Sequence, residues 1–249
     1  FEVSRYANLF EKNRKIKGES TTSYMYYDSF ISNIKANFEY SPKFIFVLRN
    51  PVDRYISHVN WLRGLGLEKK DVNQVINDED WANFSEYDDY PKQYYQFGLY
   101  NKWITRFIKN FGKKNIKIIT FEQLISDRLK TLNSCYEFLG VEKVDNLKFI
   151  RSNKSKKIVF PFIYHFLRKL SLGKTKYTKI VKYVLPKKIR EKIKGLLKYT
   201  LQNWIAVESK NNKITFENRK ILSNVYQEDV KLLRETFKYD FSEWEDFKL

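Results

Sequence analysis

The residues best suited to chemistry in this sequence surround an apolar run that ends at a cation. Residues 43–49, KFIFVLR, predict a strand that ends at Arg49, and the following segment predicts a helix that carries Ser57. Pro51 suits the first helical position, and Asn50 can cap the helix. A guanidinium at a strand end can hold a phosphate bidentately, and a serine two turns further on can add its hydroxyl. Phosphorylated ligands bind at this edge of open α/β sheets, so the pattern indicates a nucleotide-handling enzyme.

The same residues also have a purely structural interpretation. Arg49 can pair with a nearby carboxylate, and Ser57 can simply occupy one face of its helix. His58 follows Ser57 directly, and adjacent helical positions point about 100° apart, so both side chains cannot face one ligand. We therefore interpret His58 as packing or polar support. The aromatic residues Tyr100 and Trp103 are predicted to pack rather than to bind a ligand.

Hydrophobic periodicity divides the chain into alternating strands and helices. Two short apolar runs, 43–49 and 115–120, predict strands, and helix-length segments lie between them. Strands separated by helices favour parallel pairing in a covered sheet. We therefore expect an α/β fold with a central parallel sheet flanked by helices and a helix-rich C-terminal half. Helices are predicted over residues 2–11, 28–38, 51–62, 92–110, 122–139 and 216–237.

The positive charge of this chain is concentrated in one segment. Of the 47 Lys and Arg residues, 16 lie within residues 151–200, which contain one acidic residue, Glu191. This block supplies 15 of the 18 net positive charges, whereas residues 67–90 are acidic and irregular and predict a surface insertion. A basic block favours an anionic partner such as nucleic acid, anionic lipid or an acidic glycan. The alternative is a solvated surface; in both cases we expect 151–200 to be a strongly basic helical segment.

The cysteine and histidine content and the hydropathy of the sequence argue against several classes of protein. A single cysteine, Cys135, excludes a disulfide within the chain, and with only two histidines we expect no metal site. No apolar run reaches the roughly 18 residues that a membrane span needs, and no secretory leader is visible. We therefore expect a cytoplasmic protein. Residues 158–170, apolar and flanked by lysines, predict either a core helix or a peripheral contact with an anionic membrane surface at the inner membrane face.

Several segments, in order and in spacing, resemble the sulfotransferase superfamily. Residues 49–58, RNPVDRYISH, resemble its 3′-phosphate-binding segment. Residues 18–24, GESTTSY, resemble the Gly-Glu-Lys-Ser/Thr-Pro-x-Tyr segment of carbohydrate sulfotransferases. Three further segments resemble the family's Gly-x-Tyr helix, the helix after it and the C-terminal signature of bacterial members: residues 97–103, 121–140 and 232–244. The resemblance implies a single sulfotransferase domain over 1–249 with a P-loop NTPase-like sulfotransferase fold.

The resemblance also implies which residues act. In this family an arginine and a serine eight positions later hold the 3′-phosphate of the donor, 3′-phosphoadenosine 5′-phosphosulfate, which assigns that role to Arg49 and Ser57. Glu19 takes the place of the catalytic base. Lys156 and Lys157 fall where the family keeps a basic loop near donor and acceptor. The implied product is 3′-phosphoadenosine 5′-phosphate, and no metal takes part.

Two departures from the family pattern qualify this assignment. Ser20 stands where many members have lysine, and Thr22 replaces the proline, which weakens the specific acceptor assignment more than the class. The family's first strand and its loop around the 5′-phosphosulfate have no counterpart in the sequence. We therefore expect that the sequence is N-terminally incomplete.

The combined pattern predicts a sulfotransferase that acts on a hydroxyl of a carbohydrate or glycolipid acceptor. The alternative is a non-catalytic module that uses residues 151–200 to bind a polyanion. No nucleic-acid-binding motif is visible, and the aromatic residues are not interleaved with the basic block, so no nucleic acid is expected as a partner. A P-loop kinase is disfavoured because the sequence contains neither G-x-x-x-x-G-K-[ST] nor an acidic metal site.

Overall fold

The computed structural model describes residues 8, 10, 16–78, 92–146, 156–158, 191–192, 195, 206–208 and 213–248. The chain divides into two compact units. The first comprises Phe1–Asp53, Trp81–Lys148 and Leu222–Leu249, and the second comprises Arg54–Asp80 and Phe149–Ile221. Most of the predicted helix over 2–11 and most of the basic segment 151–200 lie outside the described residues. The same holds for residues 79–90 of the predicted insertion.

A parallel pair of strands forms the centre of the first unit. β1 (Phe44–Leu48) pairs with β2 (Ile116–Thr120), in a register that runs from Phe44 opposite Ile116 to Leu48 opposite Thr120. Both strands and their parallel pairing are confirmed as the sequence predicts. Because the strands run in the same direction, their carboxyl ends, with Arg49 and Phe121 directly beyond them, meet at one edge of the sheet.

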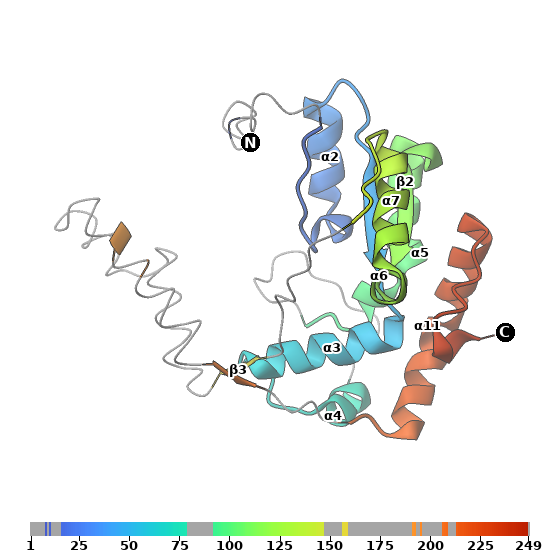
Figure 1. The fold of residues 1–249 in the computed structure, drawn as a ribbon. Coiled ribbons are helices and arrows are strands. Elements are labelled where there is room, and N and C mark those ends of the chain that lie inside the picture. The colour runs from blue at the N-terminus through green and yellow to red at the C-terminus, as the bar shows by residue number, and fades with distance from the viewer. Residues whose placement is uncertain are drawn as a thin grey trace. The chain divides into compact units, whose positions relative to one another are not determined.

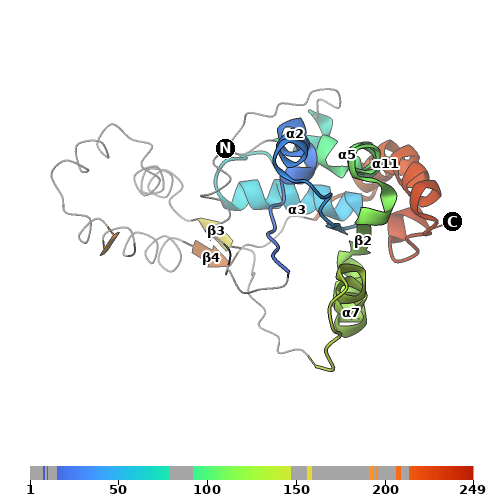
Figure 2. The ribbon, with the colours of Figure 1, turned by 90° about the horizontal axis from the view of Figure 1, so that it is seen from above.

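Helices cover both faces of this sheet. α2 (Asp28–Asn37) and α5 (Tyr100–Phe111) lie on one side and α7 (Arg128–Leu139) on the other, as Figure 2 shows. The rings of Phe44 and Phe46 on β1 each lie 5.1 Å from the ring of Phe107 on α5. Burial of these aromatic rings contributes about 1.5–3 kcal/mol per side chain and fixes α5 against the strands.

The helices after the two strands begin and end at residues with identifiable caps. The predicted helix over 122–139 is wrong as a single element, because the structure has α6 (Phe121–Ser126) and then α7. Asp127 separates them, since its side chain accepts a hydrogen bond from the backbone N–H of Lys130 and so caps α7. The helix predicted from residue 92 begins only at Tyr100, after the 3₁₀ helix η2 (Gln96–Gly98).

The last helix, α11 (Phe216–Phe237), has the predicted bounds but a different buried face. The sequence pattern predicts Ile221, Leu222, Val225, Leu232 and Leu233 on one face, yet Ile221 is 41% and Leu232 is 39% exposed. The buried residues are Leu222, Tyr226, Asp229, Val230 and Leu233. Tyr226 and Asp229 thus lie on the buried face of α11, and a prediction from the spacing of aliphatic residues alone does not include them. Figure 1 shows α11 followed by the C-terminal 3₁₀ helix η4 (Glu245–Phe247).

The second unit contains short elements. α3 (Pro51–Gly64) begins in the first unit and continues into the second. α4 (Val72–Asn77) starts with a capping box of Asp71 and Gln74, so this part of the predicted insertion is helical rather than irregular. β3 (Lys156–Ile158) pairs antiparallel with β4 (Ala206–Glu208), so these three residues of the basic segment form a strand, not the predicted helix.

Two further 3₁₀ helices belong to the first unit: η1 (Tyr24–Tyr26) and η3 (Lys113–Asn115).

Membrane-spanning helices and metal-binding clusters are both absent from the described ranges of the chain. No helix there is long and apolar enough to cross a membrane. Nor do His, Cys, Asp and Glu side chains in those ranges gather in threes that could hold a metal ion. Residues 159–170 of the predicted membrane-contacting segment lie outside the described residues.

Gly98 at the end of η2 lies directly against a buried ring of α11. A Cβ at this position would lie 2.6 Å from the ring of Tyr226. Tyr226 is fully buried, and its hydroxyl donates a hydrogen bond to the backbone oxygen of Tyr95 at 3.1 Å. Burial and this hydrogen bond hold the ring in place. Glycine at this position of the Gly-x-Tyr motif is explained by this close approach of the backbone to a side chain.

Replacing Gly98 with alanine is expected to lower the free energy of unfolding by about 1–3 kcal/mol, because the added methyl group overpacks the site. Urea denaturation followed by circular dichroism measures the change. Gly18→Ala is the matched control, because a Cβ at Gly18 meets nothing within 4 Å. Equal stabilities of the Gly98→Ala and Gly18→Ala variants would contradict the proposed close packing.

Candidate active site

Arg49 stands at the carboxyl end of β1, where the sequence predicts a phosphate-binding cation. Its guanidinium lies 5.3 Å from the centroid of the Phe121 ring, the first residue of α6. The side chain is half-buried, and within the described ranges no carboxylate pairs with it. The structural alternative for Arg49, a carboxylate partner, is therefore not found there. A half-buried guanidinium without an acidic partner is suited to binding an anion.

Asn50 fixes the turn between β1 and α3. Its side-chain oxygen accepts a hydrogen bond from the backbone N–H of Val52 at 3.0 Å, which confirms the predicted helix cap. Its backbone N–H donates to Glu122 Oε1 at 3.0 Å, and its Nδ2 donates to Asp246 Oδ2 at 2.7 Å. Asn50 is almost fully buried, so each of these hydrogen bonds satisfies a group that would otherwise be costly to desolvate.

Tyr100 and Trp244 extend this network around the strand end. The Tyr100 hydroxyl donates to the backbone oxygen of Arg49 at 2.9 Å, and Trp244 Nε1 donates to Glu122 Oε2 at 3.2 Å. Tyr100 does pack, as predicted, but its hydroxyl also positions the backbone of Arg49. The sequence interpretation missed the roles of Glu122 and Trp244. The available signal was that both residues lie within segments that resemble family motifs, 121–140 and 232–244.

Ser57 lies on α3 and its side chain is exposed. Arg49 belongs to the first unit and Ser57 to the second, so their joint grip on one phosphate stays a prediction. The His58 ring lies 5.9 Å from the Trp61 ring, and its Nδ1 lies 3.5 Å from a guanidinium nitrogen of Arg54. These contacts agree with packing or polar support by His58.

Glu19 lies in the loop before η1 and is exposed. The Tyr24 hydroxyl donates a hydrogen bond to the Glu19 carboxylate. This bond and, second, burial raise the pKa of Tyr24, while a hydrogen bond from Thr21 opposes the shift. The ring of Tyr24 stacks on Phe30 of α2, with the centroids 4.2 Å apart. A carboxylate held by a neighbouring hydroxyl at a loop is suited to general base catalysis.

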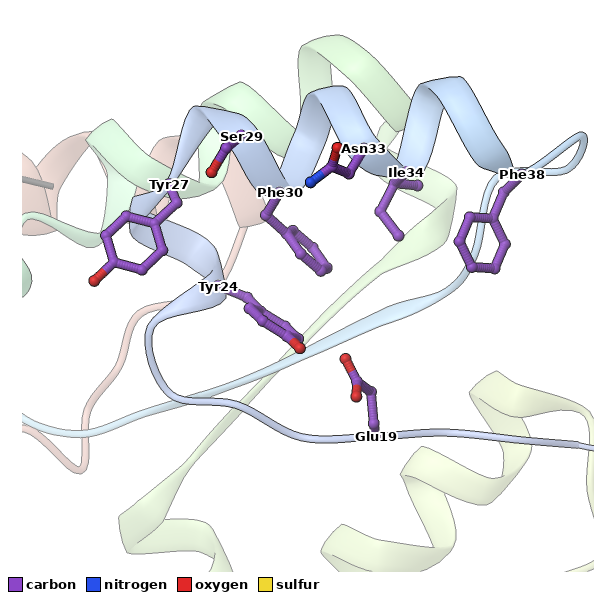
Figure 3. Close-up of a pocket in the computed structure, with 8 residues that line it drawn as sticks. All are labelled: Glu19, Tyr24, Tyr27, Ser29, Phe30, Asn33, Ile34 and Phe38. Atoms are coloured by element: carbon purple, nitrogen blue, oxygen red, sulfur yellow. The ribbon is translucent and has the colours of Figure 1, made fainter. Parts of the chain in front are cut away.

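A pocket of about 180 Å³ lies between the Glu19 loop and α2, as Figure 3 shows. Glu19 and the aromatic residues Tyr24, Tyr27 and Phe30 line it, together with further residues of α2 and its C-cap. Figure 3 shows the Glu19 carboxylate facing α2 from the opposite wall, beside the Tyr24 hydroxyl. Arg49 does not line this pocket. The predicted base thus lines a pocket whose walls do not include Arg49.

Aromatic contacts hold η1 and α2 in place beside the sheet. Tyr26 is buried, stacks on Phe97 with centroids 3.9 Å apart, and donates its hydroxyl hydrogen to the Phe97 backbone oxygen at 3.0 Å. The Trp103 ring meets Tyr26 edge-on at 5.5 Å. Arg106 on α5 forms an ion pair with Asp28, the first residue of α2. These contacts hold η1 and the start of α2, the elements that follow the Glu19 loop, against η2 and α5.

Lys156 and Lys157 lie in β3 of the second unit, with backbones opposite Glu208 and Val207 of β4. Their side chains lie outside the description that the structure gives. Their predicted contact with donor or acceptor therefore stays a prediction.

Asp229 of α11 is a buried carboxylate that the sequence interpretation missed. Its two oxygens accept hydrogen bonds from the backbone N–H groups of Asn101 at 2.9 Å and Lys102 at 3.1 Å. It therefore caps the start of α5, the helix that carries Tyr100 and contacts η1 and α2 through Trp103 and Arg106. Burial raises the pKa of Asp229 to about 6, although these hydrogen bonds and the nearby Lys102 charge lower it.

Because the pKa of Asp229 is raised from 3.8 in the unfolded chain to about 6 in the folded one, the folded state binds the proton more tightly. Its contribution to stability is present below pH 4 and is lost as the pH rises through 6, a change of about 3 kcal/mol. We expect Asp229→Asn to gain stability relative to the parent between pH 4 and pH 7. Urea denaturation across this range measures the difference. Glu228→Gln, exposed on the same helix, is the control; a difference for Asp229→Asn that does not change with pH would contradict the assignment.

Comparison with known proteins identifies the family and the fold of the chain. Residues 29–234 match the sulfotransferase domain family, and this match spans parts of both units. No curated protein matches the chain. A solved sulfotransferase from Alicyclobacillus acidocaldarius is similar, with a TM-score of 0.62 and 19% identity over 98% of this chain and 74% of that one. The parallel strands with flanking helices are therefore a sulfotransferase-like fold. The chain belongs to the sulfotransferase family and is an enzyme that transfers sulfuryl groups.

Proposed function

We propose that this protein transfers a sulfuryl group from 3′-phosphoadenosine 5′-phosphosulfate to a hydroxyl of a carbohydrate or glycolipid acceptor. The observation that carries the proposal is the pocket between the Glu19 loop and α2, where a carboxylate faces aromatic side chains. Aromatic walls suit the apolar faces of sugar rings, and a carboxylate suits the hydroxyl that must lose its proton.

Donor binding is assigned to the carboxyl end of β1. The Arg49 guanidinium there has no carboxylate partner within the described ranges. The Tyr100 hydroxyl donates to its backbone oxygen, and Asn50 fixes the turn that follows. This donor set fits a phosphate, because guanidinium groups bind phosphate oxygens bidentately. Ser57 adds a hydroxyl from the exposed side of α3, and Lys156 and Lys157 supply further positive charge.

In the proposed reaction Glu19 accepts the proton of the acceptor hydroxyl while the hydroxyl oxygen attacks sulfur. A new S–O bond forms to the acceptor as the S–O bond to the 5′-phosphate breaks. 3′-Phosphoadenosine 5′-phosphate leaves and retains the negative charge. Sulfuryl transfer, like phosphoryl transfer, depends on positioning and on stabilised charge, so binding groups on both substrates determine its rate.

The proposal is tested by incubating the protein with the donor and a panel of glycosides and free sugars. Release of 3′-phosphoadenosine 5′-phosphate together with a mass increase of one sulfuryl group on a glycoside is the expected result. Transfer to tyrosyl peptides alone, with no glycoside modified, would contradict a carbohydrate acceptor. A cytoplasmic location and a peripheral membrane contact remain part of the proposal, to be tested by cell fractionation and by vesicle flotation.

A further inference from the structure

The wall of the pocket opposite Glu19 has two chemically different stripes. Phe30, Ile34 and Phe38 follow one another at intervals of four along α2 and its C-cap, and all three line the pocket. At four residues per step they form a continuous apolar stripe, because such residues lie above one another on a helix. Figure 3 shows all three side chains directed to the same side of α2.

A polar stripe runs beside the apolar one. Ser29 and Asn33 also line the pocket, again four residues apart, and both are exposed. Neither side chain is engaged in a hydrogen bond in the part of the chain that the structure describes. Their hydroxyl and amide groups are therefore free to bind the hydroxyl groups of a ligand.

The apolar stripe is longer than a single ring requires. Phe38 lies eight positions after Phe30, which corresponds to about 12 Å along a helix. The end near Phe30 faces the stacked Tyr24 ring, whereas Phe38 is 41% exposed beyond the last turn. Figure 3 shows Phe38 at the end of the stripe farthest from Tyr24, so a sugar ring beside Tyr24 and Glu19 leaves the end of the stripe at Phe38 uncovered. An acceptor that fills the whole pocket must therefore carry an apolar group next to its sugar.

We propose that Ile34 and Phe38 form an aglycone subsite, and that the acceptor is a glycoside whose sugar lies at Glu19 and whose apolar aglycone covers these two residues. This inference rests on the proposed function. It assigns the choice among glycosides to the C-terminal end of α2. Ser29 and Asn33 bind hydroxyl groups of the sugar, and Phe38 determines the preference for the aglycone.

The test compares octyl and methyl β-glycosides of the same sugars, glucose and galactose, below the concentration at which the octyl compounds form micelles. Calorimetry measures binding, and sulfate transfer is measured in parallel. We expect the protein to favour octyl over methyl glycosides by about tenfold or more in binding and in kcat/KM. Phe38→Ala is expected to reduce this ratio to near one, while the methyl glycosides and 3′-phosphoadenosine 5′-phosphate bind as before.

Tyr40→Ala is the matched control, because Tyr40 is 79% exposed, lies two residues beyond Phe38 and does not line the pocket. It should keep the octyl preference. Equal binding of octyl and methyl glycosides, or an unchanged ratio in Phe38→Ala, would overturn the subsite even if sulfate transfer occurs. An octyl preference that depends on Phe38 without any sulfate transfer would support the subsite and overturn the proposed function instead.

Discussion

Replacing Glu19 with glutamine is expected to lower kcat by roughly 10²–10⁴-fold, the usual contribution of a general base. Glutamine keeps the size of the side chain and its hydrogen bond with Tyr24, but it cannot accept the proton of the acceptor hydroxyl. Steady-state assays with saturating donor measure the change. Binding of 3′-phosphoadenosine 5′-phosphate should not change, because Arg49 does not line the Glu19 pocket.

Two controls separate loss of the base from loss of structure. Glu39→Gln removes the same charge from an exposed position outside the pocket and should leave kcat unchanged. Glu19→Asp keeps a carboxylate on a shorter side chain and should recover part of the activity. Near-normal turnover by Glu19→Gln would exclude Glu19 as the base, whatever the result for the other variants.

Replacing Arg49 with alanine is expected to weaken the binding of 3′-phosphoadenosine 5′-phosphate by at least about 10²-fold. In the variant the 3′-phosphate lacks its guanidinium partner. Removing one partner of a charged hydrogen-bonded pair costs about 2–5 kcal/mol of binding free energy. Isothermal titration calorimetry measures the affinity. The backbone oxygen of Arg49 still accepts its hydrogen bond from Tyr100 in the variant, so the fold should be retained.

Arg63→Ala is the matched control for this measurement. Arg63 is a half-buried arginine in the last turn of α3, and its removal changes the net charge by the same amount. It should bind the nucleotide as the parent does. If the two variants lose affinity equally, the effect is one of overall charge and Arg49 is not the anchor. Binding of adenosine 5′-phosphate, which lacks the 3′-phosphate, should be weak in the parent and insensitive to Arg49→Ala.

Local patterns predicted the elements around Arg49 well. The strand before it is a short apolar run. The helix after it begins at Pro51 with Asn50 as its cap, as the residue types predict. These features depend on the conformational preferences of adjacent residues, which can be inferred from the sequence alone. The family resemblance also selected Glu19, and the structure places this residue at a pocket.

Features that depend on distant partners could not be predicted in the same way. The amphipathic pattern continues across Asp127, so the break between α6 and α7 follows from a cap that periodicity does not reveal. Asp229 occupies a helix position where an apolar residue would normally pack, and its reason lies in the N–H groups of α5. The Tyr100 hydroxyl is likewise explained only by a carbonyl 51 residues earlier in the chain.

The hydrogen bond between Asn50 and Asp246 has a consequence for the order in which the enzyme matures. The two residues are 196 positions apart, and Trp244 contacts the same network through Glu122. A ribosome makes the chain from its N-terminus, so β1 and Arg49 exist long before the residues that brace them. The turn that carries Arg49 therefore gains its hydrogen bond from Asn50 to Asp246 only after residue 246 has left the ribosome, and until then this part of the predicted donor site lacks that support.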